Sequence, residues 1–344
     1  MKKFWNWKDY HIAWQVEESD NKAKFAIVLI HGFGACKDHW RFNQKHISSI
    51  APCYALDLIG FGESNKPKSQ LSYEKKTSEN YNYCFDNWSQ QIYDFCNEIV
   101  KKPVLLIGNS IGGVIALNTS KKLSKNCISV ILIDCAQRTM DDKRLAEQSL
   151  LMRFLRPVIK TLVRQRILSY NIFKNAANPS FIEKILKVAY PSKSNIDEEL
   201  IEMLFQPTQS EGASEAFRGF INLFDDYLAP DLLEQLDNPV HLIWGEKDPW
   251  EPVKEAKKWY ETFECIKSFD IIPEAEPSAV VVLSKDTPTP IVPLPHIMLT
   301  TSLPVPPAKP HVVPSALKID VKLDPSVQAT LWLFTSAGNA PTFA

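Results

Sequence analysis

The stretch Val104-Leu105-Leu106-Ile107-Gly108-Asn109-Ser110-Ile111-Gly112-Gly113 decides the fold of this chain. Its four leading apolar residues predict a buried strand, and the glycines at 108 and 112 permit a sharp turn into a helix over residues 112–122. A turn of the form Gly-x-Ser-x-Gly exposes the serine hydroxyl at the end of the strand. Because a helix N-terminus favours negative charge, Ser110 is predicted to be the nucleophile of an acyl-transfer reaction.

Apolar runs on both sides of this turn predict further buried strands, with helical patterns between them. Alternating strands and helices indicate a mostly parallel sheet with helices on both faces, a fold of the α/β class. The expected strands are 25–30, 54–57, 104–107, 129–133, 240–244 and 266–272, and the expected helices between them are 83–100 and 112–122.

The alternation stops between residues 136 and 236, where only helices are expected. This segment predicts a helical cap inserted late in the sheet, which divides the core into residues 1–135 and 237–272. Residues 148–181 carry six basic side chains and no acidic one. Such a helix is either a solvated face over an apolar stripe or a peripheral contact with an anionic membrane. The cap helices are expected at 141–168, 179–189, 197–205 and 214–228.

Composition excludes several classes of protein. The formal net charge of −1 gives no electrostatic reason for binding nucleic acid. Seven scattered cysteines without a Cys-x-x-Cys pair predict neither a disulfide framework nor a zinc site, and a reducing cytoplasm fits them best. No uninterrupted apolar run reaches about 18 residues, so no membrane span is expected. We expect no metal and no organic cofactor, and nothing in the sequence indicates an oligomeric state.

The other parts of a serine-based site can be found by position. The backbone N–H of Ile111 and that of Phe33, in the glycine-rich loop after strand 25–30, are predicted to form the oxyanion hole. Asp248 follows strand 240–244 at the carboxyl edge of the sheet and is the predicted acid, with Glu246 as the weaker alternative. His31 is expected to be a structural loop histidine rather than the base.

Together these segments resemble the α/β-hydrolase superfamily with a helical cap, over about residues 4–272. The combination of HGFGACKDHWRFN (31–43), GNSIGG and WGEKDPWEP resembles cyanobacterial and plastid hydrolases similar to pheophytinase and chlorophyll dephytylase. That resemblance implies hydrolysis of a phytyl ester. Relatives that open epoxides or remove halogens place aspartate at the turn, so Ser110 favours acyl transfer. The segments that carry the resemblance are 29–34 (LIHGFG), 55–64 (ALDLIGFGES), 108–113 (GNSIGG) and 244–252 (WGEKDPWEP).

The histidine that the resemblance implies is not at its expected place. The order of the triad is Ser, Asp, His, and the histidine should follow the last strand, near residues 276 and 277, where Glu276 and Pro277 stand. Residues 273–314 contain eleven prolines and no glycine, so the atypical tail over residues 273–344 is expected to be extended or disordered.

Three explanations of the missing histidine stay open. A shifted reading frame near residue 275 would account for the abrupt change in composition. His296 could fold back as the base, or the chain could bind a ligand without turning it over. The sequence therefore predicts a serine hydrolase for a hydrophobic carboxylic ester, impaired by the missing histidine, with a non-catalytic binding protein of the same fold as the alternative.

Overall fold

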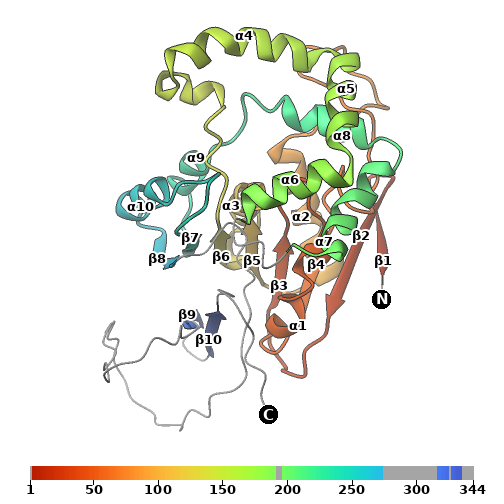
Figure 1. Ribbon diagram of the computed structural model, residues 1–344. Coiled ribbons are helices and arrows are strands. Elements are labelled where there is room, and N and C mark those ends of the chain that lie inside the picture. The colour runs from red at the N-terminus through yellow and green to blue at the C-terminus, as the bar shows by residue number, and fades with distance from the viewer. Residues whose placement is uncertain (1, 191–195, 274–315, 325–326, 335–344) are drawn as a thin grey trace.

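The computed structural model describes residues 2–190, 196–273, 316–324 and 327–334. Its eight-stranded sheet has the order β1-β2-β4-β3-β5-β6-β7-β8 (Figure 1). β2 runs antiparallel to both of its neighbours, β1 and β4. The six strands from β4 to β8 in this order are parallel to one another, as expected for the predicted α/β-hydrolase fold. The strands are β1 Lys3–Trp7, β2 Tyr10–Glu17, β3 Ala26–Ile30, β4 Cys53–Leu56, β5 Val104–Asn109, β6 Cys127–Ile133, β7 Val240–Gly245 and β8 Ile266–Ile272.

All six predicted strands are present, whereas β1 and β2 were not predicted. Their sequences are aromatic and polar rather than uniformly apolar, because one side of each packs on a helix. Trp5 and Trp7 are buried, and their indole N–H groups donate to Glu98 and Asp94. A strand that buries only alternate residues has no continuous apolar run to mark it.

Both faces of the parallel strands are covered near the centre of the sheet. In β3, Val28 and Ile30 belong to a large core cluster, while Ile27 and Leu29 face a second cluster on the opposite side. The helices that flank the sheet include α1 Gln44–Ile47, α2 Phe85–Phe95, α3 Ile111–Leu123, α9 Ala229–Leu233 and α10 Val253–Thr262, and the shorter helical turns are η1 Lys37–Trp40, η2 Cys96–Val100 and η3 Ser124–Asn126.

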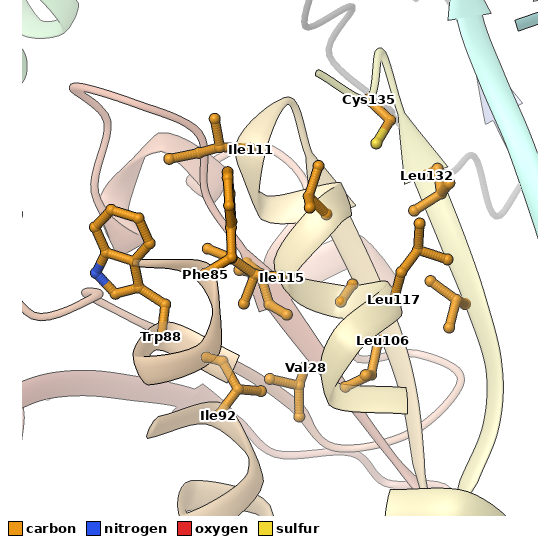
Figure 2. Packing of buried hydrophobic residues seen from close by; sticks show 14 of the residues in the cluster. Val28, Phe85, Trp88, Ile92, Leu106, Ile111, Ile115, Leu117, Leu132 and Cys135 are labelled. Carbon is orange, nitrogen blue, oxygen red and sulfur yellow. The ribbon is translucent and has the colours of Figure 1, made fainter. Parts of the chain in front are cut away.

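Figure 2 shows the packing that fixes α3, the helix behind Ser110. Phe85 of α2 lies beside Ile115 of α3, and both side chains are fully buried in one cluster with Trp88 and Ile92. Replacing one such large side chain by alanine typically costs about 2–5 kcal/mol, so α3 is held firmly against the sheet. At the edge, β8 is less well covered, and Ile271 is 41% exposed.

The cap contains more and shorter helices than predicted. The helix expected over 141–168 is η4 Asp142–Glu147, α4 Leu150–Arg164 and the start of α5 Arg166–Ala176. Ser149 caps α4 by accepting from the N–H of Met152, and extended backbone at Gln165 separates α4 from α5. The remaining cap helices are α6 Pro179–Ala189, α7 Glu198–Phe205, η5 Gln206–Gln209 and α8 Ala213–Ile221.

The prediction of one helix over 214–228 was wrong in its second half. α8 ends at Ile221, and Asn222 leaves the helical conformation. The Asn222 side-chain amide donates to the carbonyls of Val163 and Arg218. A polar side chain that satisfies carbonyl groups at a helix end helps to end the helix there.

The tail contains one antiparallel pair of strands, which the expectation of an irregular segment did not anticipate. β9 Ala316–Asp324 pairs with β10 Val327–Phe334, as a two-stranded sheet separate from the main one. Other sequence features of the tail lie outside the described residues. They are Glu276, Pro277, Val280–Leu283, His296 and His311, together with the side chains of Trp332 and Phe334.

Candidate functional site

Ser110 lies at the turn between β5 and α3 in a strained conformation. Its backbone has φ 52° and ψ −122°, a region that residues other than glycine rarely adopt. The Ser110 N–H donates to the carbonyl of Ile133 at 3.0 Å, and its carbonyl accepts from the N–H groups of Gly113 and Ala136. The end of β6 and the first turn of α3 therefore hold the strained residue in place.

The two glycines of the turn are required by close backbone contacts. A Cβ on Gly108 would lie 2.2 Å from the carbonyl oxygen of Gly112, and a Cβ on Gly112 would lie 2.4 Å from that of Ile30. No side chain fits at these distances without moving the backbone. The glycine spacing in the sequence thus follows from how tightly α3 approaches β5 and β3.

The loop after β3 lies directly against the nucleophile. A Cβ on Gly32 would lie 3.2 Å from the Cβ of Ser110, and Gly34 has φ 70°. Phe33, the predicted oxyanion donor, stands between these glycines. Ile111, the second predicted donor, is the first residue of α3, so its N–H has no partner within the helix. Both predicted donors therefore lie next to Ser110.

His31 has a structural role in this loop. Its Nε2 accepts from the N–H of Leu58 at 3.0 Å, which leaves the proton on Nδ1 to donate to the Gly32 carbonyl at 2.8 Å. Burial lowers the pKa of His31 to about 4, so the ring stays neutral. With both ring nitrogens engaged, His31 orients the loop, in agreement with its expected role.

Asp248 lies in the same cavity as Ser110, on the turn after β7. It is 8% exposed, and its Oδ1 accepts from the backbone N–H groups of Trp250 and Glu251 at 2.7 and 3.0 Å. Its buried Oδ2 has no hydrogen-bond partner among the described residues. Burial raises the pKa of Asp248, and the two N–H donors oppose that rise. The unused oxygen is suited to accept a hydrogen bond from an imidazole N–H.

The two glutamates near Asp248 differ sharply. Glu246, the weaker candidate acid, is exposed and does not line the cavity. Glu251, which sequence reasoning missed, is on the cavity wall, and its Oε2 accepts from the N–H of Gln137 at 2.8 Å. Burial raises the pKa of Glu251 to about 8, and the neighbouring Asp248 and Asp134 carboxylates add to the rise. In the sequence, only its position three residues after Asp248 could have suggested that Glu251 lines the cavity.

The cavity over Ser110 has a volume of about 630 Å³. Its polar floor is formed by the sheet edge, and most of its upper wall is formed by the cap. An apolar cavity with a few converging polar groups is typical of a small-molecule site. The apolar side chains from the cap include Phe173, Phe181, Ile182, Ile185, Leu186 and Phe217.

Five histidines fall within the described residues, and one of them, His39, lines this cavity. Burial lowers the pKa of His39 to about 4. Its Nδ1 is buried and has no partner in the described part of the chain. The two remaining histidines of the sequence, His296 and His311, are outside the described ranges. Across residues 2–190, 196–273 and the two tail strands, no cluster of ligating side chains could hold a metal ion.

Comparison with known proteins agrees with this geometry. A family model described as alpha/beta hydrolase fold matches residues 26–277. An uncharacterized hydrolase of Bacillus subtilis, YugF, is 25% identical over 242 residues, which cover 70% of this chain and 80% of that one. The protein abhd-5.2 of Caenorhabditis elegans is 34% identical over 113 residues, or 33% of this chain and 24% of that one.

Solved structures show the same fold at low sequence identity. A serine hydrolase involved in carbazole degradation has a TM-score of 0.60 at 17% identity, covering 80% of this chain and 90% of that one. A bacterial membrane phospholipase A has a TM-score of 0.58 at 21% identity, covering 80% of this chain and 78% of that one. With the strained turn, the parallel sheet and a family match over most of its length, this chain belongs to the α/β-hydrolase fold family.

Proposed function

We propose that this protein is a serine hydrolase for hydrophobic carboxylic esters, with turnover limited by the position of its base. The observation that carries the proposal is Ser110 held at a strained strand-to-helix turn on the floor of an apolar cavity of about 630 Å³. Strain of this kind persists where the surrounding structure enforces it, and it is typical of functional sites.

The chemistry follows from the atoms around Ser110. The Ser110 Oγ attacks the ester carbonyl carbon while its proton passes to a base, and the N–H groups of Phe33 and Ile111 hold the oxyanion. The C–O bond to the alcohol then breaks as the base returns the proton to the leaving oxygen. Water hydrolyses the acyl-enzyme by the same steps in reverse. Asp248 Oδ2 orients an imidazole that serves as the base.

The cap suggests the kind of ester. Its aromatic and branched aliphatic side chains give a long alkyl or acyl chain an apolar surface to cover. The resemblance to pigment-ester hydrolases adds the phytyl ester of a chlorophyll derivative to the candidate substrates. The name of one similar structure, the bacterial membrane phospholipase A, also concerns lipid esters.

A fluorophosphonate probe tests the nucleophile. We expect slow covalent labelling of the wild-type chain and none of Ser110→Ala, and hydrolysis of p-nitrophenyl esters that improves with acyl length. Loss of the base in a serine triad lowers kcat by about 10⁶, although about 10³ over water can survive. Fast hydrolysis that His296→Ala abolishes would instead assign the base to His296.

Non-catalytic binding is the second candidate function. It is favoured by Glu276 and Pro277, which stand in the sequence where the catalytic histidine is expected. In that case the probe leaves Ser110 unlabelled, while a non-hydrolysable long-chain ether still binds and is weakened by Phe217→Ala. Labelling of Ser110 with release of alcohol would exclude it.

A further inference from the structure

The outer side of α4 is an exposed apolar face. Phe154 is 80% exposed and Leu150 is 70% exposed. The exposed apolar positions recur at spacings of three and four, so they share one side of the helix. We call this the outer cap face, and it is formed by Leu150, Leu151, Phe154, Leu155, Val158 and Leu162.

The opposite side of α4 is turned inward and mixes two cations, Arg156 and Lys160, with half-buried apolar side chains such as Met152 and Val163. Arg156 is 3% exposed, and its guanidinium donates to Asp142 Oδ1 at 2.6 Å. Lys160 donates to Asp142 Oδ2 at 2.8 Å, and both cations lie over the ring of Phe224. Surface helices ordinarily bury their most apolar side, whereas α4 leaves its most apolar side exposed. Its inner ion pairs hold it in that orientation and keep the apolar face outward.

α4 lies farther from the sheet than the other cap helices (Figure 1). It contacts α5 and α8 on its inner side. The apolar exposure continues at the start of α5, where Ile167 is 76% exposed. An exposed apolar area of this extent marks a surface that binds a partner or a membrane.

The charge around this face is positive. Of the six basic residues between 148 and 181, Arg156 and Lys160 pair with Asp142, and Arg166 pairs with Glu215. Arg153, Arg164 and Lys174 are exposed and have no ion pair in the described part of the chain, although Arg164 lies over the ring of Tyr73. Free cations beside exposed apolar side chains complement a bilayer that contains anionic lipids.

The cavity of Ser110 reaches the same cap. Phe181 and Ile185 of α6 line the cavity and are also 41% and 42% exposed, so they border both the cavity and the solvent. Phe173 of α5, the helix that follows the outer cap face, lines the cavity as well. Phe181 and Ile185 thus give an ester at the cap surface an apolar entrance to the cavity of Ser110. No helix of the described ranges has the length and hydropathy to cross a bilayer.

We propose that the outer cap face binds the surface of an anionic lipid bilayer, from which the cavity takes its ester. The uptake of the ester rests on the proposed function, whereas the binding of the bilayer does not. The occupant is a bilayer because the face combines exposed apolar side chains with unpaired cations, on the cap whose next two helices line the apolar cavity.

Co-sedimentation of the full chain with vesicles tests the proposal. Vesicles of phosphatidylcholine alone are compared with vesicles that also contain phosphatidylglycerol. We expect binding to the anionic vesicles, and at least about a tenfold loss in the double variant Leu151→Ser/Phe154→Ser. Phe4→Ser on β1 is the matched control, because Phe4 is 58% exposed and lies outside the cap.

A second variant separates charge from apolar contact. Arg153→Gln/Lys174→Gln should weaken binding to anionic vesicles and reduce its salt dependence, because two cations no longer attract the lipid headgroups. Unfolding of all variants in urea should match the wild type, because the altered side chains are exposed. Binding that is unchanged in the Leu151/Phe154 variant would overturn the proposal.

Two further outcomes also decide the matter. A dimer on gel filtration that the Leu151/Phe154 variant abolishes, without vesicle binding, would assign the face to a second copy of the chain and overturn the proposal. Ser110→Ala should bind vesicles like the wild type. A chain that binds vesicles but hydrolyses no ester would thus contradict the proposed function and leave the bilayer contact supported.

Discussion

The ring of Phe33 stacks on the ring of Phe220, with centroids 3.8 Å apart and an interplanar angle of 13°. Phe33 belongs to the loop beside Ser110, and Phe220 belongs to cap helix α8. The Phe33 ring also meets Phe61 edge to face. The cap therefore contacts the predicted oxyanion loop itself, so the position of the loop depends on the cap.

Phe220→Ala should loosen this loop. The rate of Ser110 labelling by a fluorophosphonate should fall by about 10- to 100-fold, because small displacements of an oxyanion donor are costly. Amide hydrogen exchange of residues 32–34 should become faster, a readout that needs no turnover. Phe224→Ala is the control, since Phe224 packs under Arg156 and Lys160. Equal exchange in the two variants would show that the stack does not hold the loop.

The buried His31 and the half-buried His39 should differ in their response to replacement. His31→Phe leaves the buried N–H of Leu58 without its acceptor, so the free energy of unfolding should fall by about 1–3 kcal/mol. His39→Phe removes a buried Nδ1 that has no partner among the described residues, so stability should be unchanged or higher. Urea unfolding measures both. A large loss in His39→Phe would reveal a partner for that ring elsewhere in the chain.

Glu251 should make stability depend on pH. Its pKa is about 8 in the folded chain against an ordinary value of 4.5, so the folded state holds its proton more tightly than the unfolded state. This contribution is fully present below pH 4.5 and is lost as pH rises toward 8. Each unit of pKa shift corresponds to about 1.4 kcal/mol.

Glu251→Gln removes that dependence and keeps an acceptor for the Gln137 N–H. We expect the variant to be more stable than the wild type at pH 8–9, with a flatter profile between pH 5 and 8, in thermal unfolding. Glu246→Gln serves as the control, because Glu246 is exposed. Identical pH profiles for wild type and Glu251→Gln would mean that Glu251 ionises normally.

Arg218 should be the most sensitive ionic residue of the cap. It is 2% exposed, and its guanidinium donates to Ser69 Oγ at 3.0 Å and to Glu74 Oε1 at 2.7 Å. Arg218→Ala leaves Glu74 without its strongest partner, and we expect a loss of about 3–5 kcal/mol in urea unfolding. The exposed Glu183–Lys187 pair is the comparison, and Lys187→Ala should cost about 0–1 kcal/mol. Similar costs for the two variants would contradict the buried role of Arg218.

The sequence alone determined the features that depend on neighbouring residues. Apolar runs predicted the six parallel strands, and the glycine spacing predicted the strained turn at Ser110, because these signals are contained in a few consecutive residues. The choice of Asp248 over Glu246 as the better acid was also made from position in the sequence. The structure places Asp248, and not Glu246, on the cavity wall.

Tertiary structure decided what depends on residues far apart in the chain. β1 and β2 could not be predicted from apolar runs, because β1 buries only Trp5 and Trp7, and β2 buries only Ile12 and Ala13 among partly exposed residues. The position of the Phe33 ring likewise depends on a distant partner, Phe220. The outward apolar face of α4 depends on the ion pair between Arg156 and Asp142. Burial, which raises the pKa of Glu251 and leaves Oδ2 of Asp248 without a partner in the described residues, exists only once the cap and sheet enclose the cavity.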